Sequence, residues 1–295
     1  MEKNLSPAPE VVSGGVSRGM ALMLLFSLFD SSAGLFIKLI PWNPFVTAGL
    51  RGFLTFFVLL VFYRVRKTSF RLSRFSFFGA LVMAVMFISF ISATRITTAA
   101  NAAMLQYTNP MFILFFGRIF FNQKLKLADM GVVVFVFTGI WLLFSGSFGE
   151  SRALGNGLAL LSGVAFAAMF TFNNHVKSEE DHIGAILLGH ILTFIICIPF
   201  LFLFTPDLSP SNAWPLIAMV ILQQAVPFIL YARAIRLCPP LAASLITMTG
   251  PVLNPFWVWI FTGETPSGHA VAGGVIILLA VGLWSVHSLL RKEMI

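Results

Sequence analysis

Long apolar stretches separated by short polar breaks dominate this amino-acid sequence. About ten such stretches occur, each roughly 20 residues long, and a helix of that length spans the ~30 Å hydrocarbon core of a lipid bilayer. The predicted spans are Met20–Ile40, Phe45–Tyr63, Phe75–Thr94, Ala99–Gly117, Ala128–Phe148, Leu154–His175, Ile183–Phe204, Trp214–Ala234, Leu241–Gly263 and Gly268–Leu290.

The apolar stretches favour helices over membrane β-strands. Barrel strands alternate apolar and polar residues, whereas these stretches are apolar on all sides. Only helices and closed barrels satisfy their own backbone hydrogen bonds in lipid. Composition agrees, because 10% charged residues against 58% hydrophobic ones cannot cover a water-soluble protein of 295 residues. We therefore predict an all-α integral membrane protein with ten transmembrane helices.

The basic residues indicate how the chain is oriented. A net charge of +8 suggests nucleic-acid binding in a soluble protein, but here the charges lie between apolar spans. If both termini face the cytoplasm, most of the 19 Lys and Arg residues lie on that side, and only Lys38, Arg95 and Arg152 lie outside. Cytoplasmic loops are enriched in Lys and Arg. We predict a multi-pass protein of the cell (inner) membrane with cytoplasmic N- and C-termini and no nucleic-acid partner.

The second half of the chain repeats features of the first in the same order. Five predicted spans precede residue 150 and five follow it. An odd number of spans in each repeat inserts the second copy upside down, and inverted repeats are typical of alternating-access transporters. The matched residues are Arg95 with Arg236, Ala102 with Ala243, Thr108 with Thr249, Pro110 with Pro251, Phe115 with Phe256, Ile119 with Ile260, and Phe120 with Phe261.

These patterns predict four segments. A leader rich in Ser, Pro, Gly and Val is expected to be disordered in the cytoplasm over residues 1–17. The first five-helix repeat covers 18–150 and the second, inverted repeat covers 151–290, followed by a short cytoplasmic tail over 291–295. No segment is long enough for a soluble domain, so the activity is expected within the membrane.

Two charged residues inside predicted spans are candidates for function, because charge is costly at bilayer depth. Asp30 lies near the middle of the first span, and Arg51 lies at a similar depth in the second. One interpretation is that Asp30 exchanges a proton for substrate. The other is a buried Asp30–Arg51 ion pair, which is costly to break once formed. Both hold if the pair breaks during the transport cycle.

Polar residues gather beside prolines on the fourth and ninth spans, which are equivalent in the repeat. A mid-span proline frees a backbone carbonyl, so Pro110 and Pro251 are predicted hinges. Nearby amides either satisfy those carbonyls or line a substrate cavity. Gln223 and Gln224 on the eighth span, followed by Tyr231, are expected to point inward. The predicted substrate-binding residues are Asn101, Gln106, Tyr107, Asn109, Gln224, Tyr231, Thr247, Asn254 and Trp257.

Other classes of protein lack their usual signals. No Walker motif is present, so ATP does not drive the protein directly. An intramembrane enzyme needs metal-ligand spacing or paired midplane carboxylates, and a channel needs a selectivity loop. His190 aligns with Arg51 in the repeat and is interpreted as a packed neutral side chain. Cys197 and Cys238 are interpreted as small apolar residues. No enzymatic activity, cofactor or metal is predicted.

Two segments carry a family resemblance. The first runs from Thr98 to Pro110 (TAANAAMLQYTNP), and the second from Pro240 to Pro251 (PLAASLITMTGP). The motif Gly263-Glu264-Thr265-Pro266 follows the second segment. With these motifs the chain resembles the EamA-type ten-helix exporters of the drug/metabolite transporter (DMT) superfamily. The first repeat has Asn122-Gln123 in place of Gly263-Glu264.

The resemblance implies export of a small metabolite, such as an amino acid, a related organic molecule or a drug. The expected mechanism is secondary active transport by alternating access, with a proton gradient acting through Asp30. A uniporter, an exchanger or a channel remains the alternative. The expected partners are the small-molecule substrate, the lipid bilayer and protons, and the protein is expected to be a monomer.

Overall fold

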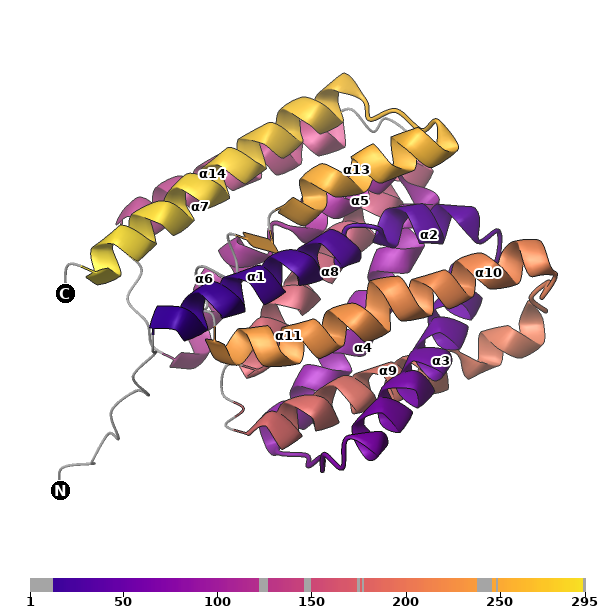
Figure 1. The fold of residues 1–295 in the computed structure, drawn as a ribbon. Helices are drawn as coiled ribbons and strands as arrows, with labels where there is room; N and C mark the ends of the chain where they lie inside the picture. The colour runs from indigo at the N-terminus through magenta and orange to yellow at the C-terminus, as the bar shows by residue number, and fades with distance from the viewer. Residues whose placement is uncertain are drawn as a thin grey trace.

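The computed structural model describes residues 13–121, 127–145, 150–173, 176, 178–237, 246–247 and 249–293. All regular secondary structure in these ranges is helical (Figure 1). The first half contains α1 (Ser13–Asp30), α2 (Ala33–Leu39), α3 (Pro44–Val65), α4 (Arg74–Ile96), α5 (Ala99–Gln106), α6 (Asn109–Phe121) and α7 (Leu127–Ser145). The second half contains α8 (Glu150–Asn173), α9 (Glu179–Leu203), α10 (Pro210–Ala218), the π-helix η1 (Met219–Ala225), α11 (Val226–Leu237), α13 (Thr249–Thr262) and α14 (Gly268–Glu293).

These helices coincide with the predicted spans. In the described residues, six stretches are long and apolar enough to cross a membrane, and two shorter apolar helices lie near the C-terminus. The α5–α6 pair and α7 occupy the two remaining spans. The all-α integral membrane fold is therefore confirmed. The six long stretches are Arg18–Leu39, Pro44–Val65, Arg74–Ile96, Arg152–Phe172, Glu179–Leu203 and Pro210–Ala234.

Large apolar side chains cover the outside of this bundle. Trp141 on α7 is 69% exposed, Phe202 on α9 is 83% exposed and Leu283 on α14 is 69% exposed. Soluble proteins rarely expose contiguous apolar surface on this scale. Lipid contact accounts for it, because hydrocarbon chains solvate such side chains and not polar ones.

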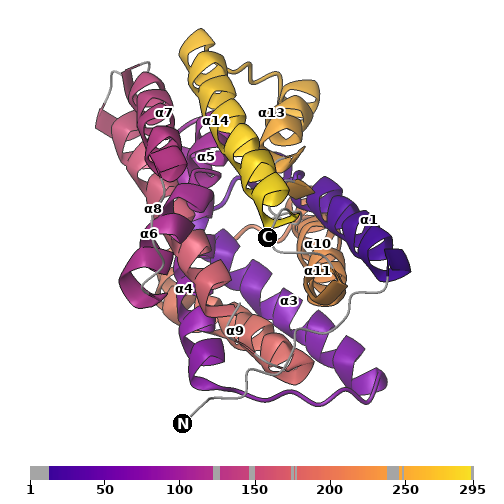
Figure 2. The same ribbon diagram turned by 90° about the vertical axis from the view of Figure 1, so that its left-hand side faces the viewer.

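The two halves of the chain pack against each other in reciprocal pairs. The second span of each half meets its counterpart, α3 against α9, and so do the fifth spans, α7 against α14. The first and third spans cross over, with α1 on α11 and α8 on α4. Figure 2 shows the α7–α14 pair at one edge of the bundle and the α3–α9 pair at the opposite edge. This exchange of equivalent helices is the pattern that two inverted repeats produce.

The first span is interrupted in the middle. Helix α1 ends at Asp30 and α2 begins at Ala33. The two serines between them bond back to the end of α1: Ser31 Oγ donates to the Leu28 oxygen at 2.7 Å, and Ser32 Oγ donates to the Phe29 oxygen at 2.6 Å, which also accepts the Ser32 N–H at 3.2 Å. Side-chain hydroxyl groups thus help to satisfy the last carbonyls of α1 at a depth where the bilayer supplies no water.

The fourth span is interrupted in a similar way. Helix α5 ends at Gln106 and α6 begins at Asn109, and Thr108 Oγ1 donates to the Leu105 oxygen at 2.7 Å. Pro110 is the second residue of α6, where a missing N–H costs no helical hydrogen bond. The predicted hinge residue therefore begins a new helix. Its counterpart Pro251 is the third residue of α13, and residues 241–245 and Met248 lie outside the described residues.

The eighth span contains a π-helix where a continuous α-helix was predicted. Pro227 has no N–H to offer the carbonyl of Gln223, four residues earlier. Gln224 Nε2 donates to that carbonyl oxygen instead, at 3.2 Å. The π-helix η1 covers Met219–Ala225 and therefore includes both glutamines. Such segments are rare, and they occur frequently at functional sites.

Candidate functional site

The interruptions in these spans meet at one buried cavity. Asp30 and Ser31 reach it from the break between α1 and α2, Gln106 and Tyr107 from the break after α5, and Gln223 from η1. Both halves of the chain thus contribute polar groups to the same space. The other lining residues are Arg51, Tyr231, Gly250 and Asn254, with an apolar wall of Phe26, Ala33, Met86, Phe87, Phe90, Ala103, Phe166, Met169, Phe170 and Phe228.

The cavity is small in this conformation. Its volume of about 50 Å³ leaves room for a few water molecules. Sites for organic ligands usually have volumes of roughly 300–1,000 Å³. An organic substrate therefore enters only if the surrounding helices move apart. Because the lining comes from both halves, a movement of one half against the other would change its volume.

Asp30 binds a glutamine in this conformation. Gln223 Nε2 donates to Asp30 Oδ1 at 3.0 Å, and Gln224 Nε2 in turn donates to Gln223 Oε1. Asp30 and Arg51 line the same cavity, yet these two described residues form no ion pair with each other. The predicted pairing is thus not present here, because Gln223 is the partner of the carboxylate instead.

Arg51 is fully buried against an aromatic ring. Its guanidinium carbon lies 4.4 Å from the centre of the Phe87 ring, and its side chain is 1% exposed. Its Nε and Nη2 atoms have no hydrogen-bond partner among the described residues. His190 stacks on the same Phe87 ring, with centroids 5.0 Å apart, as expected for a packed imidazole. A buried cation with unpartnered donor groups is unusual, since buried charges are normally paired.

Some of the predicted substrate-binding residues lie at the cavity, and two lie directly behind it. Gln106, Tyr107, Tyr231 and Asn254 line it. Trp257 is one residue further back, and its Nε1 atom donates to Ser31 Oγ at 3.0 Å. Gln224 lies behind Gln223 and donates a hydrogen bond to its side chain. Gln223, which lines the cavity, was also predicted to point inward.

Three predicted residues are buried elsewhere. Asn101 Nδ2 donates to Asn156 Oδ1 at 3.2 Å and so connects α5 to α8. The backbone oxygen of Thr247 accepts a hydrogen bond from Ser27 Oγ at 3.4 Å. Asn109 is buried at the start of α6 and does not line the cavity. In this conformation Asn101 and Thr247 thus connect different segments of the chain.

Sequence reasoning missed Gly250 and the break at Ser31. A Cβ atom on Gly250 would lie 2.5 Å from the Tyr107 hydroxyl oxygen, so only glycine permits this approach of α13 to the α5–α6 break. The Gly-Pro pair at Gly250 and Pro251 was a signal for this contact. Ser31 gave no comparable signal, because neither glycine nor proline interrupts the first span.

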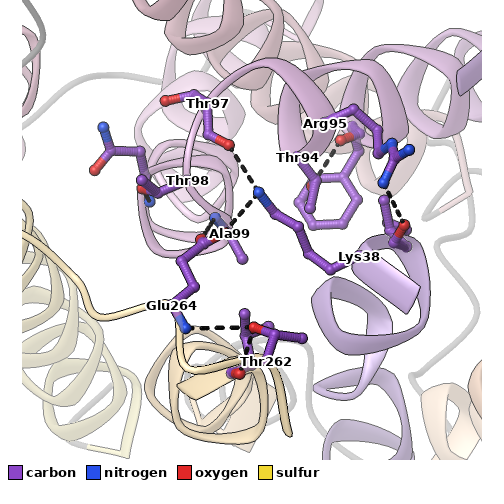
Figure 3. A network of polar contacts seen from close by, with 12 residues as sticks. Lys38, Thr94, Arg95, Thr97, Thr98, Ala99, Thr262 and Glu264 are labelled. Carbon is purple, nitrogen blue, oxygen red and sulfur yellow. Dashed lines mark hydrogen bonds and ion pairs between the residues drawn. The ribbon is translucent and has the colours of Figure 1, made fainter. Parts of the chain in front are cut away.

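A network of ionic and hydrogen bonds joins the two halves of the chain at one end of the bundle (Figure 3). Lys38 Nζ lies 2.7 Å from Glu264 Oε2 and donates to the Thr97 oxygen at 3.2 Å. Glu264 Oε1 accepts a hydrogen bond from the Ala99 backbone N–H at 2.8 Å and so caps α5. The network ties α2 and α5 of the first half to the turn after α13. It lies at the end of the bundle opposite the start of α1 and the end of α14 (Figure 1).

A bundle of two reciprocal halves, with interrupted spans around a shared polar cavity, is typical of membrane transport proteins. The model of the EamA-like transporter family matches the chain twice, over residues 17–145 and 153–286. The chain belongs to the EamA-like transporter family. It is accordingly a membrane transporter and not an enzyme.

Curated relatives agree with this assignment, and a solved structure shares the fold. The pseudopaline exporter CntI of Pseudomonas aeruginosa strain UCBPP-PA14 is 23% identical over 227 residues, covering 75% of this chain and 80% of the exporter. An uncharacterised transporter of Archaeoglobus fulgidus is 21% identical over 268 residues, covering 89% of this chain and 94% of its own length. A solved structure described only as a crystal structure of a protein matches with a TM-score of 0.62 and 20% identity, covering 96% of this chain and 99% of that one. That likeness concerns the fold alone.

Proposed function

We propose that this protein exports a small organic metabolite across the cytoplasmic membrane by alternating access. The observation that carries the proposal is the meeting of three interrupted spans, from both halves of the chain, at one polar cavity. Inverted repeats with broken helices form midplane sites in secondary transporters, and each half rocks against the other. The relative named as an exporter supports the outward direction.

The end that contains the Lys38–Glu264 network is proposed to be closed and to face the outside of the cell. Lys38 belongs to the predicted outer side, and the Lys38–Glu264 ion pair joins the two halves there. In the outward-open state this pair is broken, and in the conformation described here it keeps the outer path shut. Both termini then lie in the cytoplasm, and one monomer contains the complete transport path.

A proton gradient acting on Asp30 is the proposed energy source. The carboxyl group is buried at the α1–α2 break, beside the other groups of the cavity. Proton binding from outside returns the empty protein to the inward-open state, and proton release to the cytoplasm frees the carboxylate for the next cycle. The titratable groups around it are Arg51 on α3, Tyr107 after α5, Tyr231 on α11, and His190 on α9 behind Phe87.

Counterflow in proteoliposomes tests this function. Purified protein is reconstituted with labelled amino acids, nucleosides and quaternary amines, each tested separately. A carrier gives saturable uptake that unlabelled substrate inside the vesicle accelerates, and an imposed pH gradient drives it further. Ionic current without exchange would indicate a channel and contradict the proposal. Exchange that ignores the pH gradient would leave a carrier but remove the proton coupling.

A further inference from the structure

The cavity contains two opposite charges that form no direct ion pair with each other. Asp30 and Arg51 both line it, and Asp30 is hydrogen bonded to Gln223 whereas Arg51 stacks on Phe87. Burying a charge without an ionic partner is costly in a protein and more so in a bilayer. Each charge therefore has unused capacity for a ligand group of the opposite sign.

The Arg51 atoms without a hydrogen-bond partner form one edge of its guanidinium group. Nε and Nη2 point to the same side of the planar group, and neither has a hydrogen-bond partner among the described residues. Two parallel N–H groups on one edge match the two oxygens of a carboxylate. Stacking on Phe87 fixes the plane of the guanidinium group before any ligand arrives.

We propose that this Arg51 edge is an oxyanion subsite that binds the carboxylate of a zwitterionic substrate. The ammonium group of the same substrate lies toward Asp30, and its apolar part lies against the wall formed by Phe26, Phe90, Phe166 and Met169. The inference rests on the proposed transport function and specifies the chemical class of its substrate. A phosphate group offers the same oxygen geometry, and the test below separates the two.

Binding of the twenty L-amino acids to purified protein tests the subsite. Each amino acid that binds is compared with its amide, which lacks the carboxylate, and with its N-acetyl derivative, which lacks the ammonium group. We expect at least one apolar amino acid to bind and both derivatives to bind about tenfold more weakly or worse. If none of the twenty binds, or if the amide binds as tightly as the acid, the proposal is wrong. A phosphonate analogue that binds more tightly than the carboxylate would assign the subsite to phosphate and also overturn it.

The variant Arg51→Lys isolates the role of the paired donors. Lysine keeps the positive charge but not the planar edge, so affinity for the amino acid falls about tenfold or more while affinity for its amide is unchanged. Arg66→Lys is the matched control, because Arg66 also lies over an aromatic ring, Phe62, but at the surface. The melting temperature without ligand checks that both variants are folded.

Failure of this inference differs from failure of the transport function. Saturable counterflow of a cationic or uncharged solute, unaffected by Arg51→Lys, would remove the oxyanion subsite and leave the carrier in place. An absence of counterflow for every solute tested would instead remove the transport function.

Discussion

Lys38 and Glu264 form an ion pair of 2.7 Å between the end of α2 in the first half and the turn after α13 in the second. Their side chains are 18% and 26% exposed, so solvent screens the pair only in part. Glu264 also caps α5 through the Ala99 N–H. One carboxylate thus holds three segments together at this end of the bundle.

Reversing one charge of this pair should impair the protein, and reversing both should restore part of the loss. In Lys38→Glu two carboxylates face each other, and in Glu264→Lys two ammonium groups do. We expect each single variant to lower both the melting temperature and counterflow. The double variant recovers the ionic contribution, on the order of 1 kcal/mol, but not the α5 cap, because lysine cannot accept the Ala99 N–H.

The Arg71–Glu180 ion pair supplies the control for these charge substitutions. It joins the α3–α4 loop to the start of α9 at 3.4 Å, and its side chains are 77% and 37% exposed. Pairs this exposed contribute little, so Glu180→Gln should leave both measurements almost unchanged. Equal effects of Glu180→Gln and Glu264→Gln would show that the Lys38–Glu264 pair has no special role.

Asp30→Asn should separate proton coupling from transport. Asparagine can still accept the hydrogen bond from Gln223, but it does not titrate. In the wild type, substrate binding should weaken as the pH falls, because a protonated carboxyl group no longer attracts a cationic group. The variant should bind independently of pH and lose acceleration by a pH gradient, measured from about pH 5 to 8. Full gradient-driven transport by the variant would exclude Asp30 as the coupling residue.

Gly250→Ala should disrupt the contact between α13 and the α5–α6 break. The added Cβ would lie 2.5 Å from the Tyr107 hydroxyl oxygen, closer than packed atoms approach. We expect strongly reduced counterflow and a lower melting temperature, with partial rescue when Tyr107→Phe removes the hydroxyl. Gly131→Ala is the control, because nothing lies within 4 Å of its added Cβ. Counterflow at the wild-type rate in Gly250→Ala would mean that this contact does not matter.

Pro227→Ala should stabilise the eighth span and impair transport. Alanine supplies the N–H that can bond to the Gln223 carbonyl, which favours α-helix over the π-helix η1. That change rotates Gln223 relative to Asp30 and weakens the bond between them. We expect a higher melting temperature together with lower substrate affinity. A variant with unchanged affinity would indicate that η1 does not position Gln223.

The span positions could be predicted because apolar length and lipid thickness dictate them almost alone. The interruptions of the spans could be predicted only where a helix-breaking residue such as proline is present. Pro110 marks the break before α6. In the sequence, Ser31 and Ser32 look like serines of a continuous helix, and only the structure shows their hydroxyl groups bonded to the last carbonyls of α1. The π-helix depends on how Pro227 and Gln224 share one carbonyl, and apolar patterning does not report this.

The cavity residues of the fourth and ninth spans were predicted by closeness to the prolines, which selects a depth in the membrane but not a face of a helix. Gln106 and Tyr107 meet this criterion and also face the cavity. Asn101 lies on the same span but bonds to Asn156 on α8. Arg51 and Asp30 were identified as charges at one depth. Their separate partners, Phe87 and Gln223, depend on neighbouring helices that the sequence does not place.

Thiol labelling from both sides of the membrane tests alternating access most directly. Ala103 lines the cavity, so Ala103→Cys, with Cys197→Ala and Cys238→Ala, places a single thiol there. An impermeant methanethiosulfonate reagent is applied to right-side-out and to inside-out vesicles, with and without Glu264→Gln. The account predicts labelling from both sides, with the outside rate raised and the inside rate lowered by Glu264→Gln. Labelling from one side only, or both rates rising together as in an open pore, would contradict it.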